Sequence, residues 1–174
     1  MSTTTTRPPA WAEATSILGE AWRFFVRHLP VVLALGVLAS AQRFLSVGGL
    51  APWAGGAAGE IFTGAVRVVF VVWVVRRLAR THGIDWSRAG ERWSAWFTRH
   101  GSAVLASLVY LAALLLVAKV VPDALAGRVG GVDRPTYLAA ELAIKNVTVI
   151  PFTMIWMTLL TVVRPVAEGG DRED

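Results

Sequence analysis

Residues 19–30, GEAWRFFVRHLP, run directly into a long apolar segment, and residues 90–102, GERWSAWFTRHGS, do the same later in the chain. Both stretches begin with Gly-Glu-x-Trp, and both carry Arg-His immediately before the apolar residues. Weak internal similarity of this kind is typical of membrane proteins built from repeated units. We therefore predict that the chain contains two copies of one structural unit.

The apolar residues are grouped into blocks. Hydrophobic residues make up 55% of the 174 residues and charged residues 17%, which is too apolar for an ordinary soluble domain. Blocks of this kind predict helices that span a bilayer, here over residues 29–47, 60–78, 102–121 and 138–163. Prolines mark their limits: we expect Pro30 at the start of the first span, Pro122 to close the third, and Arg164-Pro165 to close the fourth.

The segments that precede the first and third spans have two faces. Over residues 11–29 and 85–100, apolar and charged side chains each recur every three or four positions, which predicts amphipathic helices. Tryptophan on one face and arginine on the other suits the headgroup boundary of a membrane. The interfacial anchors that we expect from this pattern are Trp11, Trp22, Arg23, Arg27, Trp86, Trp93, Trp96 and Arg99. The alternative is an amphipathic helix of a soluble subdomain, for which little surrounding sequence is present.

These elements together predict the fold class. It is an all-α integral membrane protein with four transmembrane helices, arranged as two parallel repeats that each begin with an amphipathic interfacial helix. Repeat one covers residues 11–80 and repeat two residues 85–165 of a single membrane domain at 11–165. Residues 1–10 and 166–174 are polar, and we expect them to be flexible tails.

Arginine is distributed unevenly about the predicted spans. Most arginines fall on the side of the termini, whereas the opposite side holds Arg128 and Arg134, with Arg43 and Lys119 at span ends. The positive-inside rule then places both termini in the cytoplasm. The richness in Ala, Val, Gly and Arg is typical of a high-GC bacterium, so we predict a multi-pass protein of the bacterial cytoplasmic membrane in contact with anionic lipids on the cytoplasmic side.

One pattern resembles a known class of proteins. It consists of Ala21-Trp22-Arg23-Phe24-Phe25 and Arg27-His28, echoed by Arg92-Trp93 and Arg99-His100. It is similar to bacterial multi-pass membrane domains in which such a surface helix leads into each span, for example the YciC-like proteins and the membrane domain that accompanies some glycerophosphoryl diester phosphodiesterases. The hydrolase domain found beside the second example has no counterpart here, so the resemblance implies an architecture and no active residue.

Polar residues within the predicted spans form a candidate intramembrane cluster of Glu60, Arg67, Glu141 and Lys145. Arg67 is separated from Arg76 by about 13 Å of helix at 1.5 Å per residue, which places it near the middle of a bilayer core. A charge there is costly and should have a partner. We interpret Arg67 either as half of a buried pair with Glu60 or Glu141 that fixes helix packing, or as a binding group for an anionic headgroup or substrate. Glu141 and Lys145 have the i, i+4 spacing of an interfacial pair.

No motif for a reaction is present. His28, His82 and His100 lack metal-ligand spacing, cysteine is absent, and there is no HExxH, GxSxG or Walker loop, so no catalytic residue, cofactor or metal is predicted. Membrane attachment explains the basic, aromatic helices more simply than nucleic acid, and no nucleic-acid partner is predicted. The first interpretation is an accessory or scaffold subunit or self-oligomer without evident catalysis, and its alternative is a small transporter or lipid-handling protein that uses Arg67 with Glu60 or Glu141. An integral-membrane enzyme comes third, because no nucleophile and base can be named.

Overall fold

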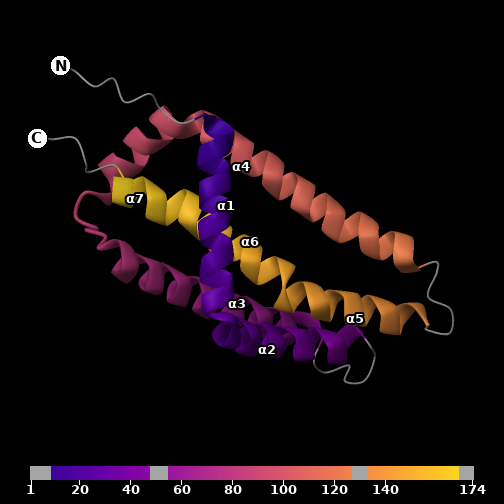
Figure 1. The fold of residues 1–174 in the computed structure, drawn as a ribbon. Coiled ribbons are helices and arrows are strands. Elements are labelled where there is room, and N and C mark those ends of the chain that lie inside the picture. The colour runs from indigo at the N-terminus through magenta and orange to yellow at the C-terminus, as the bar shows by residue number, and fades with distance from the viewer. Residues whose placement is uncertain (1–8, 48–54, 127–132, 169–174) are drawn as a thin grey trace, which may run out of the picture.

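The computed structural model describes residues 9–47, 55–126 and 133–168, and every secondary-structure element within these ranges is helical (Figure 1). The predicted tails at residues 1–8 and 169–174 lie outside the described residues, as do residues 48–54 and 127–132 of the predicted loops. Four helical stretches are long and apolar enough to cross a membrane: Leu29–Ser46, Gly56–His82, Ala89–Leu125 and Arg134–Ala167. The prediction of a helical protein with four candidate spans is confirmed.

A separate helix precedes the first span and lies across the others (Figure 1). α1 (Ala10–Arg27) ends at His28, whose φ of −110° and ψ of 22° interrupt the helix before α2 (Leu29–Val47). The Nδ1–H of His28 donates to the Phe24 carbonyl oxygen at 3.0 Å, and the His28 backbone N–H donates to the same oxygen. The imidazole thus holds the break in place, and α2 leaves α1 in a new direction.

Residues 83–88 connect the second and third spans. α3 (Gly56–His82) ends at Gly83, whose φ of 60° and ψ of 38° lie in the left-handed region that glycine adopts at little cost. α4 (Ala89–Ala126) contains a break at His100, where φ is −111° and ψ is 19°. There too the Nδ1–H donates to a carbonyl oxygen four residues earlier, that of Trp96 at 3.1 Å. Residues 89–99 therefore form a distinct segment ahead of the span.

The fourth span is an interrupted helix made of α5 (Arg134–Val147), α6 (Val149–Thr158), the π-helix η2 (Leu159–Val163) and α7 (Arg164–Glu168). Asp133 begins α5, because its carboxylate accepts the Thr136 N–H at 3.2 Å. The hydrogen bonds with Thr136 hold the pKa of the Asp133 carboxyl below its ordinary value. Thr148, at φ −117° and ψ −75°, separates α5 from α6 just before Pro151, which has no N–H for the helical ladder.

Two prolines do not close their helices, and the sequence prediction is wrong at both. Pro122 lies inside α4, which continues to Ala126, and Pro165 lies inside α7, which continues to Glu168. Pro165 has no N–H for the Thr161 carbonyl, and the wider π turn of η2 precedes it. The Trp93 Nε1–H donates to the Thr161 carbonyl oxygen instead, at 2.7 Å. The predicted tail is also wrong at its start, since Val166 is buried within α7.

The core lies where α1 crosses the bundle. α1 packs chiefly on α4 and α6 and turns one face inward: Ala14, Ile17, Ala21, Phe24 and Phe25. Buried side chains of the other helices meet this face, including Val74, Trp96, Trp156 and Leu160. On the far side α2 packs along α5, and a Cβ placed on Gly36 would lie 3.0 Å from the Val147 Cα. The glycine permits that close helix contact.

Candidate functional site

Arg67 of α3 contacts a neutral amide. Its Nη2 donates to the Oδ1 of Asn146 at 3.3 Å, and Asn146 is 4% exposed at the end of α5. Within the described part of the chain this amide, and neither Glu60 nor Glu141, is the hydrogen-bond partner of Arg67. The structure has a charge–amide contact in place of the predicted carboxylate pair, and no carboxylate of the described residues forms an ion pair with Arg67.

A small hollow lies beside this contact. It has a volume of about 20 Å³ and is bordered by α2, α3 and α6, through residues that include Ala39, Phe70 and Met154. The Arg67 Nε is buried there and has no hydrogen-bond partner among the described residues. A cavity of about 10–15 Å³ suffices for one water molecule, so this hollow accommodates a water that could accept the Nε–H, but no substrate.

The rest of the predicted intramembrane cluster is divided between two places. The Lys145 ammonium donates to the Glu141 carboxylate within α5, as the i, i+4 spacing predicts. Glu60 is exposed near the start of α3, two turns before Arg67. The structure thus brings Glu141 and Lys145 together and does not assemble all four residues into one site.

Neutral polar residues that the sequence analysis did not single out join the spans instead. The Thr63 hydroxyl donates to the Oε1 of Gln42 at 2.7 Å between α3 and α2, and the Ser40 hydroxyl donates to the Ala143 carbonyl oxygen at 2.8 Å. Ser40, Gln42 and Thr63 are all buried. Their signal in the sequence is a single polar residue in an apolar run, and such residues are known to join membrane helices.

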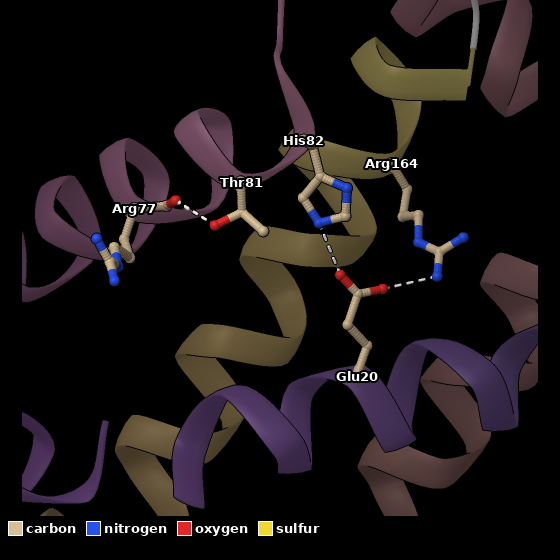
Figure 2. A network of polar contacts seen from close by, with 5 residues as sticks. All are labelled: Glu20, Arg77, Thr81, His82 and Arg164. Carbon is tan, nitrogen blue, oxygen red and sulfur yellow. Dashed lines mark hydrogen bonds and ion pairs between the residues drawn. The ribbon is translucent and has the colours of Figure 1, made fainter. Parts of the chain in front are cut away.

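Glu20 of α1 joins a network of polar contacts at the other end of the bundle (Figure 2). One carboxylate oxygen accepts from Arg164 Nη2 of α7 at 2.6 Å, and the other lies 2.8 Å from His82 Nε2 at the end of α3. Their side chains are 17% to 27% exposed, so water screens these contacts only in part. One carboxylate therefore ties α1 to α3 and α7, an arrangement that we call the Glu20 clamp.

The other two histidines of the chain also lie along α1. His100 Nε2 of α4 is 3.7 Å from the Glu13 carboxylate, and His28 Nε2 accepts from Arg77 Nε of α3 at 3.4 Å. Because the Nδ1–H of His28 donates to a carbonyl, its Nε2 has the free electron pair that this contact needs. The three histidines thus attach α1 to two spans, a role that their sequence spacing did not reveal.

No protein-family model, curated protein or solved structure matches this chain. The resemblance to the YciC-like and phosphodiesterase-associated membrane domains accordingly remains a prediction. Among the residues that the structure describes, no group of three or more His, Cys, Asp or Glu side chains could hold a metal ion.

The predicted interfacial anchors have different environments. Trp11, Trp22, Trp86 and Trp93 are 47% to 57% exposed, and Arg23, Arg27 and Arg99 are exposed as well. Trp96 is an exception that corrects the prediction, because it is 1% exposed. Its ring stacks on His100 with a centroid separation of 4.9 Å, in the core beneath α1. Trp96 is a packing residue and is unavailable to headgroups.

Proposed function

We propose that this chain is a small multi-pass protein of the bacterial cytoplasmic membrane that acts by association, as an accessory or scaffold subunit or as a self-oligomer, and without catalysis. The observation that supports the proposal is the uncovered apolar surface of α4. The span of α4 is the most apolar of the four candidates, yet only 11% of it is buried within the chain, against 44% of the span at Arg134–Ala167.

α4 runs along the edge of the bundle (Figure 1). It packs on α1 and α7, and Pro122, towards its end, accepts a hydrogen bond from the Tyr137 hydroxyl of α5 at 2.5 Å. One face of α4 packs inward through residues that include Ala103 and Ala106, whereas Leu105 and Leu116 on its outer face are each 64% exposed. Membrane helices associate by close packing, so a long helix of this kind suits a partner helix as well as lipid.

The proposal includes the internal repeat. His28 and His100 have nearly equal backbone dihedral angles, and each ring packs on the aromatic side chain four residues earlier, Phe24 at 4.3 Å and Trp96 at 4.9 Å between centroids. Two copies of one unit should turn from the leading helix into the span in the same way. This common turn supports a duplicated unit of leading helix and two spans.

The proposal also includes an interfacial position for α1 and cytoplasmic termini. The inward face of α1 is apolar, whereas Arg23 and Arg27 on the same helix are exposed. Anionic lipids attract such arginines at the membrane surface. The ends of the spans that meet near α1 carry most of the described arginines, and the positive-inside rule then favours the cytoplasm for that side.

The alternative of a transporter or lipid-handling protein has one supporting observation, the buried Arg67 Nε beside its hollow. The hollow of about 20 Å³ has room for one water and for no substrate. Association is therefore the function that the geometry supports better.

Single-cysteine cross-linking tests the association proposal, because the chain contains no cysteine. We expect Leu116→Cys in isolated membranes to give one cross-linked product of constant mass, either a dimer of this chain or its adduct with a single partner. Val68→Cys on α3 is the matched control, since Val68 is 63% exposed and Leu116 is 64% exposed. The same yield from both positions, or no product from cysteines at Leu105, Leu116 and Val120 in turn, would contradict association through α4.

A further inference from the structure

A hollow of about 470 Å³ lies along the last turns of α3, on the exposed side of that helix. Its floor is apolar and is formed by Val71, Val72, Val75 and Ala79, while its polar end is formed by Arg76 and Arg80, with Trp86 beside them. The lining changes from apolar to cationic along the axis of a candidate membrane span.

The turn after α3 brings Trp86 to this hollow. Gly83 adopts a left-handed conformation, and the N–H groups of Gly83 and Ile84 both donate to the Ala79 carbonyl oxygen, which reverses the chain. Asp85 then accepts the N–H of Ser87 at 3.0 Å and its hydroxyl at 2.7 Å. These hydrogen bonds hold the pKa of the Asp85 carboxyl below its ordinary value, so it stays ionised while it fixes the turn. Trp86 is 47% exposed and lines the hollow next to the arginines.

Arg76 and Arg80 are one turn apart on α3, and both are exposed. Within the described ranges neither has an ion pair or hydrogen bond, whereas nearby Arg77 donates to His28 and Arg164 donates to Glu20. The acidic residue nearest to them in sequence, Asp85, accepts two hydrogen bonds from Ser87. Two guanidinium groups therefore border the hollow, and no described residue accepts a hydrogen bond from either.

We propose that this hollow binds one anionic phospholipid. The phosphate lies between the guanidinium groups of Arg76 and Arg80, which form the short charge-assisted hydrogen bonds that phosphate oxygens accept. The upper part of an acyl chain covers Val71, Val72 and Val75, and the Trp86 ring lies at headgroup level, where tryptophan is favoured. The site relies on the membrane position that is part of the proposed function, and it does not depend on association through α4.

Native mass spectrometry of the whole protein from mild detergent tests the site, with phosphatidylglycerol and phosphatidylcholine as probes. We expect the wild type to retain one phosphatidylglycerol in preference to phosphatidylcholine. Arg76→Gln/Arg80→Gln should lower that affinity about thirtyfold, the effect expected for two surface arginines that contact an anionic lipid. Arg23→Gln/Arg27→Gln is the matched control, because it removes two exposed arginines at the same spacing on α1 that attract anionic lipid at the membrane surface but do not line the hollow, so the lipid retained in detergent should be unchanged.

The remaining outcomes separate the alternatives. An equal loss in both double variants would mean general attraction of anionic lipid and would overturn the site, as would full retention in Arg76→Gln/Arg80→Gln. If inorganic phosphate displaced the lipid at equal concentration, the arginines would form a site for a free anion, and the proposal would also be overturned. Cross-linking of Leu116→Cys should persist in the Arg76→Gln/Arg80→Gln background, so failure of the lipid site is distinguishable from failure of the association proposal.

Discussion

Arg67 meets a neutral amide at the position where the sequence led us to expect a carboxylate, and this changes what substitutions there should do. If Arg67 were paired with a buried carboxylate, removal of either partner would destabilise the fold strongly, because the other charge would be left buried and unpaired. With the neutral Asn146 as its partner, Arg67 has no counter-ion among the described residues, and at the predicted depth such a charge costs at least ~2.5–3.5 kcal/mol. Leucine at position 67 should therefore be tolerated, whereas loss of the Asn146 amide should not be.

We expect Asn146→Leu to lower the free energy of unfolding in detergent by about 1–3 kcal/mol, because it removes the partner of a partly buried charge. Arg67→Leu should leave the stability unchanged or raise it, and the double variant should recover most of the Asn146→Leu loss. Unfolding midpoints for the two single variants and the double variant give the coupling energy, expected at about 0.5–3 kcal/mol. Glu60→Gln is the control, and its effect on stability should be the same in the wild type and in the Arg67→Leu background. Strictly additive effects of the two leucine substitutions would show that the contact with Asn146 does not hold Arg67.

At the scale of one element, α1 is held from several sides by side chains of other helices. Glu20 contacts α3 and α7 through the Glu20 clamp, Glu13 faces His100 of α4, and the apolar face of α1 packs on α4 and α6. The same helix has exposed Trp11 and Trp22 on its outer side. α1 is thus joined to the bundle by both polar and apolar contacts while part of its surface stays available to the membrane boundary.

Glu20→Gln should weaken the attachment of α1 to the bundle and leave the apolar contacts of α1 in place. The amide cannot supply the negative charge that Arg164 contacts at 2.6 Å, and hydrogen bonds to charged groups contribute about 1.5–3 kcal/mol. We expect a lower unfolding midpoint and faster hydrogen exchange of the amides of residues 10–27, with little change in α2. Glu91→Gln, at an exposed carboxylate of α4, is the matched control and should leave both measurements as in the wild type. Exchange in α1 that does not respond to Glu20→Gln would mean that apolar packing alone holds the helix.

The helices were predictable where the signal was an apolar run, and α2 has the predicted bounds of 29–47. The helix ends were not predictable where a side chain from another helix replaced a missing backbone hydrogen bond. Pro165 would close an isolated helix, but Trp93 from α4 satisfies the Thr161 carbonyl that it leaves free. Periodicity also could not separate Trp93 from Trp96, since both lie on aromatic faces and only packing decides which one faces lipid. The sequence analysis did not identify Asn146 as the partner of Arg67, because a single neutral polar residue in an apolar run does not indicate which charged side chain it will contact.

At the scale of the whole molecule, the two ends of the bundle differ in what they carry. The end near α1 holds the Glu20 clamp, the three histidines and the hollow beside Arg76 and Arg80. At the opposite end, the described polar contacts include Lys119 with Asp123 and the Asp133 cap of α5. Recognition of lipid or of a soluble partner should therefore involve the first end, and association within the bilayer should involve the length of α4.

This difference makes the orientation of the protein in the membrane a decisive test of the whole proposal. Ser94 and Ala124 are exposed residues of α4 on either side of the predicted span at 102–121, and the chain has no native cysteine to interfere. A membrane-impermeant maleimide applied to intact cells should label Ala124→Cys, and it should label Ser94→Cys only after the membrane is permeabilised, because the positive-inside rule favours the cytoplasm for the arginine-rich side. The reverse pattern would place Arg76 and Arg80 away from the leaflet whose anionic surface attracts them, and labelling of both residues in intact cells would show that α4 does not cross the membrane. Either result would remove the physical basis of the lipid site, because its apolar floor needs hydrocarbon beside it and its arginines need an anionic headgroup at the same depth.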